Sequence, residues 1–356
     1  MATDKPSVHA VRWQTAPMII DADAHVIESE RTWDYLEPHE KKYRPVALDG
    51  DGDEKFWLVD GQLFSREAGD LELPIAVRQL DDLKTRAEIM SRSGIEAQVL
   101  YPTLFLQGMP SKRPEIQVAL CRSYNRWLAD IWNGDNRFYW AVVPPLLDMQ
   151  ASLAELEYGK KNGARAVFLR GIEGEWLLHD PYLAPLYKKA EELDLAIGVH
   201  AGNGNQQFKD VLFRKDLYFF GITPILAGFN ALASSGLQKS YKTLRFGFIE
   251  AGSQWIPYLV REAARRHEKI KTKGKVEDFS TFLAENRIWV TARTDDDLEY
   301  VLRYTGQSVL MLGTDFGHLD PAAEIDAFDV LRAKPEIGKG TVDAILSTNA
   351  RKFYAI

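Results

Sequence analysis

Cysteine is nearly absent from this sequence, since Cys121 is the only one among 356 residues. An intrachain disulfide is therefore excluded, and the chain fits a reducing compartment. The opening stretch "MATDKPSVHAVRWQ" has no apolar segment of the kind found in secretory signals. From these two absences we expect a cytoplasmic protein.

Clusters of basic residues are also missing, and the formal net charge is −7. A chain without a basic stripe has no electrostatic footprint for nucleic acid or for an anionic membrane, so we expect neither as a partner. The longest apolar stretch, residues 218–236, contains glycines, a proline and Asn230. We interpret it as a helix buried in the fold or at a subunit interface, rather than as a membrane span.

What the sequence does contain is a series of short apolar runs. Runs such as "EAQVLYP", "ARAVFLR" and "LAIGVHAG" are apolar throughout instead of alternating, which is typical of parallel strands covered on both faces. We expect eight strands of this kind, near Met18–Asp23, Ala97–Tyr101, Tyr139–Pro144, Ala166–Arg170, Ala196–His200, Arg245–Glu250, Ile288–Thr291 and Val309–Asp315.

The segments between these runs have helical periodicity. In residues 79–95, for example, Leu83, Ala87 and Met90 fall on one helical face. Residues 113–132 follow the same pattern. Eight strand–helix units predict an α/β fold of the (β/α)8 TIM-barrel type, and we expect it to form a single domain over residues 1–356.

One small insertion follows strand 1, between Ser29 and Val77. Within it, Asp60 and Gly61 stand between the apolar runs of "EKFWLVDGQLF", which indicates a β-hairpin. We expect residues 29–77 to form a lid or a rim over the mouth of the barrel.

Ionisable residues stand where the predicted strands end. The first strand runs into "DADAH", where Asp21, Asp23 and His25 occupy every second position and would share one face of a regular strand. Three ionisable groups on one face need water, a partner or a metal, because burying bare charge is costly. Later strand ends supply further candidates, which are His200, Glu250, Asp315 and, three residues on, His318.

The carboxyl ends of TIM-barrel strands meet at one mouth, so we expect these side chains to converge there. Histidine and carboxylate groups from several strands in one place predict a metal site. Each residue also has a structural alternative. His25 or His200 could be a core histidine bonded to a carbonyl, Asp315 could be a helix N-cap, and Glu250 could form an ion pair with Arg261 or Arg293. His318 could be an outer hydrogen-bond donor, and for Asp21 we favour a structural hydrogen bond.

The motifs "DADAH", "YPT", "VHAG", "TDFGH" and "STNARKFY" resemble the amidohydrolase superfamily, in its amidohydrolase-related branch, over almost the whole chain. That branch includes aminocarboxymuconate-semialdehyde decarboxylase and resorcylate-type decarboxylases. The resemblance implies a metal-dependent TIM barrel. Carried onto this chain residue by residue, it implies metal ligands at Asp23, His25, His200 and Asp315.

Two positions depart from the pattern of that branch. Strand 1 usually carries His-x-His, whereas here Asp23 precedes His25, and strand 6 usually supplies a histidine where this chain has Glu250. Carboxylates favour harder ions such as Mn and Fe, and they can bridge two metals. The sequence also resembles a smaller branch of the superfamily, including 2-aminoisobutyrate hydroxylases, whose dinuclear Fe or Mn/Fe sites activate O2.

The leading hypothesis is therefore a monooxygenase with two divalent metals, Fe and/or Mn, that hydroxylates a small carboxylate-bearing or CoA-linked substrate. Asp23, His25, His200 and Asp315 would hold one metal. Glu250 would hold the second with a shared carboxylate, and His318 is a further candidate ligand. The catalytic residues would be Glu250, Asp315 and His200, and the partners would be O2 and the substrate.

The alternative is a mononuclear Zn- or Mn-dependent hydrolase or non-oxidative decarboxylase of an aromatic or unsaturated carboxylic acid. One metal would bind His25, His200 and Asp315 and would polarise a carbonyl or activate water. Glu250 would then be a general acid or base. A third possibility is a barrel that binds metal but only supports a catalytic paralogue, which the complete ligand set disfavours.

Three residues are candidates for substrate binding. Arg170 would clamp a carboxylate with its two-pronged guanidinium, or would form an ion pair with Glu173 or Glu175. Tyr101 and Trp255 would line the pocket, with packing as the alternative that we favour for both. We expect either a homo-oligomer or an assembly with a paralogous chain.

Overall fold

The computed structural model describes residues 18–51, 54–66, 73–211, 218–271, 280–318 and 323–356. Eight parallel strands form one sheet in the order β1-β5-β6-β7-β10-β11-β12-β13. Their bounds are Ile20–His25 (β1), Ala97–Tyr101 (β5), Phe138–Val142 (β6), Ala164–Arg170 (β7), Ala196–His200 (β10), Phe246–Ile249 (β11), Ile288–Ala292 (β12) and Leu310–Leu312 (β13).

The backbone just beyond β13 closes this sheet against β1. Asp315 donates its amide to the Asp23 carbonyl at 2.9 Å, and His25 donates its amide to the Phe316 carbonyl at 2.8 Å. Ala24 and Phe316 form a parallel bridge at the same place. The fold is therefore the predicted α/β TIM barrel, with the first and last strands meeting along one seam.

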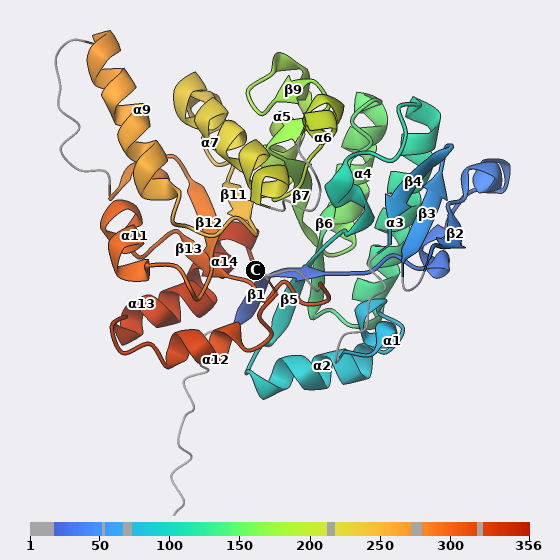
Figure 1. Ribbon diagram of the computed structural model, residues 1–356, viewed down its shortest axis with the longest axis horizontal. Coiled ribbons are helices and arrows are strands. Elements are labelled where there is room, and N and C mark those ends of the chain that lie inside the picture. The colour runs from blue at the N-terminus through green and yellow to red at the C-terminus, as the bar shows by residue number, and fades with distance from the viewer. Residues whose placement is uncertain (1–17, 52–53, 67–72, 212–217, 272–279, 319–322) are drawn as a thin grey trace, which may run out of the picture.

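Helices surround the barrel and cover its strands (Figure 1). The α-helices are Ile75–Arg78 (α1), Leu83–Arg92 (α2), Pro114–Gly134 (α3), Met149–Lys161 (α4), Ala184–Glu192 (α5), Gln206–Val211 (α6), Thr223–Ser235 (α7), Leu237–Ser240 (α8), Ile256–Lys271 (α9), Phe282–Glu285 (α10), Leu298–Thr305 (α11), Ala327–Arg332 (α12), Lys339–Asp343 (α13) and Asn349–Tyr354 (α14). Short 3-10 helices span Glu30–Trp33, Pro38–Tyr43, Leu104–Gln107 and Pro181–Leu183, and π-helical turns span Tyr218–Ile222 and Ala344–Thr348.

The apolar stretch at residues 218–236 contains α7, which buries Ile225, Phe229 and Leu232 in the protein. It is thus a helix buried in the fold, one of the two predicted possibilities. Within the described residues, no helix combines the length and the apolar character that a bilayer crossing requires.

The insertion after strand 1 contains a three-stranded antiparallel sheet of Val46–Asp49 (β2), Lys55–Val59 (β3) and Gln62–Ser65 (β4). The predicted hairpin is confirmed. Asp60 and Gly61 turn the chain with φ angles of 48° and 76°, the left-handed conformation that a two-residue turn of this kind needs. The side chain of Gln107 donates to the Ser65 carbonyl at 3.2 Å, which ties this sheet to the loop after β5. A lid or rim function for residues 29–77, and the single-domain assignment of residues 1–356, stay predictions.

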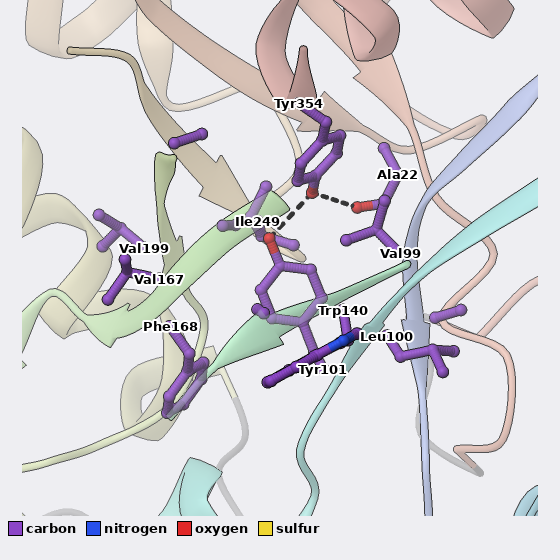
Figure 2. Packing of buried hydrophobic residues seen from close by; sticks show 14 of the residues in the cluster. Ala22, Val99, Leu100, Tyr101, Trp140, Val167, Phe168, Val199, Ile249 and Tyr354 are labelled. Carbon is purple, nitrogen blue, oxygen red and sulfur yellow. Dashed lines mark hydrogen bonds between the residues drawn. The ribbon is translucent and has the colours of Figure 1, made fainter. Parts of the chain in front are cut away.

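Two buried tyrosines, Tyr101 and Tyr354, meet among the apolar side chains of the core (Figure 2). The Tyr354 hydroxyl donates to the Ala22 carbonyl at 2.6 Å and lies 2.9 Å from the Tyr101 hydroxyl. Gly198 leaves room for this arrangement, because a Cβ there would lie 2.5 Å from the Tyr101 hydroxyl. Helix α14, which buries Ala350, Phe353 and Tyr354 in the core, therefore contacts the barrel interior through the Tyr354 hydroxyl.

Candidate metal centre

The structure brings the six candidate ligands together at the carboxyl ends of the strands. Asp23 and His25 belong to β1, His200 is the last residue of β10, Glu250 follows β11, and Asp315 and His318 follow β13. Two groups of four donors each lie within 4.8 Å of one another, and both include His25 and Glu250. Their members are Asp23, His25, His200 and Glu250 in one group, and His25, Glu250, Asp315 and His318 in the other.

The Nε2 atom of His25 is the centre of this cluster. It lies 3.1 Å from His200 Nε2, 3.4 Å from both Asp23 Oδ1 and Asp315 Oδ1, and 3.6 Å from Glu250 Oε2. Adjacent ligands of an octahedral ion are about 3 Å apart when the metal–ligand bonds are about 2.1 Å. The spacing around His25 is therefore close to that of donors that share one ion.

Backbone carbonyls determine which nitrogen of His25 and of His200 carries the proton. His25 Nδ1 lies 3.1 Å from the Pro102 carbonyl, and His200 Nδ1 lies 2.8 Å from the Ala201 carbonyl. A carbonyl only accepts hydrogen bonds, so each Nδ1 is the donor. Assigned from these contacts, the Nε2 atom of each neutral ring holds a lone pair. Two lone pairs and several carboxylates thus converge at one point, which is favourable only if a proton or a metal cation lies between them.

The hydroxyl of Thr103 orients the ring of His318 in the same way. This hydroxyl has one proton and donates it to the Val26 carbonyl at 2.7 Å, so it accepts from His318 Nε2 at 2.9 Å. The other nitrogen, His318 Nδ1, lies 2.9 Å from Asp315 Oδ1. The ring of His318 also stacks on that of His25, with the ring centroids 3.8 Å apart. Whether His318 is a ligand or an outer donor to Asp315 stays a prediction.

Asp23 is held in its ionised form. Burial by itself raises the pKa of this carboxyl, but the positive charge and N–H donors of the His200 and His25 rings in their protonated form outweigh burial and lower the pKa well below its usual range. Its Oδ1 atom lies 3.2 Å from His200 Nε2. A buried carboxylate in contact with two imidazole nitrogens is a suitable ligand for a divalent cation.

Two of the candidate carboxylates sit on strained backbone. Glu250 and Asp315 have φ angles of 56° and 51°, a left-handed conformation that residues other than glycine rarely adopt. The Thr291 hydroxyl accepts a hydrogen bond from the Glu250 amide at 2.7 Å, and the Asp23 carbonyl accepts one from the Asp315 amide. Such strain costs on the order of 1–3 kcal/mol per residue and concentrates at functional sites. The left-handed backbone at Glu250 also explains why β11 ends at Ile249, one residue short of the predicted boundary.

Asp21 does not share a face with Asp23 and His25, contrary to the expectation from regular alternation. The register of β1 against β5 shifts between Asp21 and Ala24, a bulge that breaks the two-residue period. Asp21 accepts hydrogen bonds from the Gln98 side chain and from the amide and hydroxyl of Thr314. Burial raises its pKa to about 6. Its structural role is the one that the sequence favoured.

Arg170 is fully buried and forms an ion pair with Glu173. Its guanidinium also donates to the Phe105 carbonyl, and its backbone amide donates to Glu173 at 2.6 Å. The ion pair that sequence reasoning held as the alternative is therefore present. Two nitrogens of the guanidinium are engaged in these contacts, and a substrate contact by Arg170 stays a prediction.

The aromatic candidates pack within the protein. The Tyr101 ring lies beneath the histidines, 5.0 Å from the ring of His200, and its hydroxyl points to Tyr354 (Figure 2). Trp255 packs 5.1 Å from Phe229 and donates its indole N–H to backbone carbonyls of its own loop. Both have the packing role favoured from the sequence, and a substrate contact by either stays a prediction.

Sequence reasoning missed the residues that orient the ligands. The Pro102 and Ala201 carbonyls are main-chain atoms, which no side-chain pattern reveals. Glu28 was missed as well, although a buried acid three residues after a candidate ligand is a usable signal. Both of its carboxylate oxygens bind backbone amides next to the site.

The fold and the cluster together define a TIM-barrel enzyme with a candidate metal centre. Residues 20–356 match the family described as Amidohydrolase. The chain therefore belongs to the amidohydrolase family, which confirms the resemblance noted in its motifs. No curated protein matches the sequence.

Solved structures with the same fold include three informative examples. An amidohydrolase from Mycobacterium avium subsp. paratuberculosis K-10 has a TM-score of 0.76 at 17% identity, with 96% of this chain and 98% of that chain covered. The 5-carboxyvanillate decarboxylase of Sphingomonas paucimobilis has a TM-score of 0.70 at 16% identity, with coverage of 95% and 99%. A dihydroxybenzoic acid decarboxylase from Polaromonas sp. JS666, solved with bound manganese and the inhibitor 2-nitroresorcinol, has a TM-score of 0.66 at 18% identity, with coverage of 95% and 97%.

Proposed function

We propose that this protein is a metal-dependent, non-oxidative decarboxylase or hydrolase that acts on an aromatic or unsaturated carboxylic acid. One observation carries the proposal: His25 and His200 direct lone-pair nitrogens at each other across 3.1 Å, beside the Asp23 and Asp315 carboxylates. This donor set is suited to a divalent cation. Amidohydrolase membership and the decarboxylases among the structural neighbours support this chemistry over the O2-activating alternative.

The donor chemistry favours a single hard ion, with manganese as the first choice. A donor set of imidazoles and several carboxylates suits Mn²⁺, whereas zinc sites are typically richer in sulfur and nitrogen donors. His25 supports one ion rather than two, because its Nε2 has a single lone pair although it belongs to both donor groups. Asp23, His25, His200 and Asp315 would hold the ion. When bound, it would supply Lewis-acid polarisation of a substrate oxygen or activation of water.

Glu250 is the residue that we assign to proton transfer. Its side chain is 14% exposed, whereas the side chains of Asp23 and Asp315 are 3% exposed. It also lies slightly farther from both histidine nitrogens than Asp23 does. A carboxylate open to the barrel mouth can deliver a proton to the carbon that loses CO2, or can remove one from an attacking water.

A second candidate function is supported by the second donor group. Glu250, Asp315 and His318 could hold another ion next to the first, with a carboxylate as the bridge. That arrangement would fit the dinuclear Fe or Mn/Fe monooxygenase predicted from the sequence. The monooxygenase requires Glu250 to be a metal ligand, whereas the decarboxylase or hydrolase uses Glu250 for proton transfer.

Metal content tests the choice between them. The chain would be purified without chelator from cells supplied with iron and manganese, and analysed for metal per chain. The proposal predicts one equivalent of Mn or Zn, no O2 uptake with reductant, and CO2 release or hydrolysis with a panel of hydroxylated benzoic acids and their esters. Two equivalents of Fe or Mn with O2 uptake would replace it with the monooxygenase, and no bound metal would refute both.

A further inference from the structure

The loop after β5 contacts two of the candidate ligands. The Pro102 carbonyl accepts from His25 Nδ1 at 3.1 Å, and the next residue, Thr103, accepts from His318 Nε2 at 2.9 Å. These two contacts determine which nitrogen each ring turns toward the cluster. Residues 102–104 therefore act as one template for ligands that come from the first and last strands of the barrel.

Glu28 fixes this template from the loop after β1. Its Oε1 atom accepts the Thr103 amide at 3.1 Å, and its Oε2 atom accepts the Leu104 amide at 3.0 Å. The residue is 2% exposed, so these are buried hydrogen bonds with little competition from water. Two hydrogen bonds from successive backbone amides to one buried carboxyl group make a directional attachment.

We propose that Glu28 is a positioning residue of the metal centre, which orients His25 and His318 by holding residues 102–104 in place. The inference rests on the proposed metal-dependent function. It goes beyond that function because Glu28 lies outside the cluster and would act only through the loop. Four hydrogen bonds support the inference: two from backbone amides to Glu28, and two between the loop and the imidazole rings.

The decisive variant is Glu28→Gln. The amide side chain has one acceptor oxygen, so its NH2 group would face a backbone N–H and one of the two attachments would be lost. Removal of hydrogen-bond partners that orient metal ligands typically lowers metal affinity about 10- to 100-fold. We expect a loss of this size for Mn²⁺, measured in competition with a chromogenic chelator, and an altered absorption spectrum of the Co²⁺-loaded protein.

Glu155→Gln is the matched control. Glu155 is also a buried carboxylate and binds two side chains, Asn125 and Arg126, but it lies on α4 and contacts none of the candidate ligands. This variant should lose stability without a change in Mn²⁺ affinity or in the Co²⁺ spectrum. The comparison separates a positioning role from a general effect of removing a buried charge.

A second pair of variants covers the case in which Glu28→Gln does not fold. Thr103→Val removes the hydroxyl that holds His318, whereas Thr103→Ser keeps it. The valine variant should lose Mn²⁺ affinity and the serine variant should retain it.

Wild-type affinity and an unchanged Co²⁺ spectrum in a folded Glu28→Gln protein would overturn the inference and leave the proposed function intact. If Glu28→Gln does not fold, wild-type Mn²⁺ affinity in Thr103→Val would overturn the inference and leave the proposed function intact. A wild-type chain that binds no divalent ion would overturn the proposed function, and the inference with it.

Discussion

His25 and His200 face each other from opposite sides of the barrel. They end β1 and β10, the first and the fifth strand in the order of the sheet, yet their Nε2 atoms are 3.1 Å apart. Each ring is held at its other nitrogen by a backbone carbonyl. The barrel thus builds one donor pair from two halves of the chain, and four predictions test the site around it.

Replacement of Glu250 by glutamine should leave the metal in place and reduce turnover. Glutamine cannot exchange a proton, and general acid–base catalysis contributes about 10²- to 10⁴-fold to a rate. We expect a fall in kcat of that order with Mn²⁺ affinity within about threefold of wild type. Asp23→Asn is the contrasting variant and should lose the metal. A Glu250→Gln protein that has lost one of two bound ions would instead identify Glu250 as a ligand of a dinuclear centre.

Gly313→Ala should disturb the site through Asp23. A Cβ at Gly313 would lie 2.3 Å from the Cβ of Asp23 and 3.0 Å from its Cα and amide nitrogen, so either β1 or β13 must move. We expect a loss of Mn²⁺ affinity, measured by titration calorimetry. Gly340→Ala is the control, because a Cβ at Gly340 meets no atom within 4 Å. Equal affinities in the two variants would show that the position of Asp23 is not critical.

Tyr101→Phe should lower stability and spare the metal. The substitution removes one hydroxyl from the buried pair with Tyr354, while Tyr354 keeps its bond to the Ala22 carbonyl. A lost hydrogen bond of this kind costs about 1 kcal/mol, to be measured by urea unfolding. Metal affinity and KM should match wild type if Tyr101 only packs beneath the site. A raised KM would instead indicate that Tyr101 contacts the substrate, as the sequence predicts.

The stability of the metal-free protein should depend on pH through Glu28. Burial raises the pKa of Glu28 from its ordinary 4.5 to about 7, although backbone N–H donors oppose the rise. The folded state therefore binds this proton more tightly than the unfolded state does. The free energy of unfolding should fall as pH increases from about 4.5 to about 7, by at most about 1.4 kcal/mol per pH unit from this group. Urea unfolding across this range should give a shallower pH dependence in Glu28→Gln, and identical slopes would contradict the raised pKa.

Most of the fold could be predicted because its signal is local. Continuous apolar runs identified all eight barrel strands, and the bounds of β5 and β10 are those expected. The hairpin at Asp60 and Gly61 was likewise encoded in two adjacent residues that accept a left-handed backbone. Strand ends were less well predicted: β11 ends before the left-handed residue Glu250, and β13 ends at Leu312, three residues before Asp315.

The convergence of the candidate ligands could also be predicted, but not the way in which they are held. Ionisable residues at strand ends converge because all parallel strands of a closed barrel end at one mouth. The bulge in β1 that separates Asp21 from Asp23 has no comparable signature, since it depends on the register against a distant strand. The choice of nitrogen in His25 and in His200 depends on main-chain carbonyls, and therefore on the finished structure.

The seam between β1 and the end of β13 affects when the candidate metal centre can assemble. The amide of Asp315 binds the Asp23 carbonyl across that seam, so residues almost three hundred positions apart must meet before the ligand set is complete. A nascent chain that has emerged only through β12 holds Asp23, His25 and His200 but lacks Asp315. The full set of candidate donors therefore exists only after the last strand has closed the barrel, and the proposed ion would find all four of its ligands only at that stage.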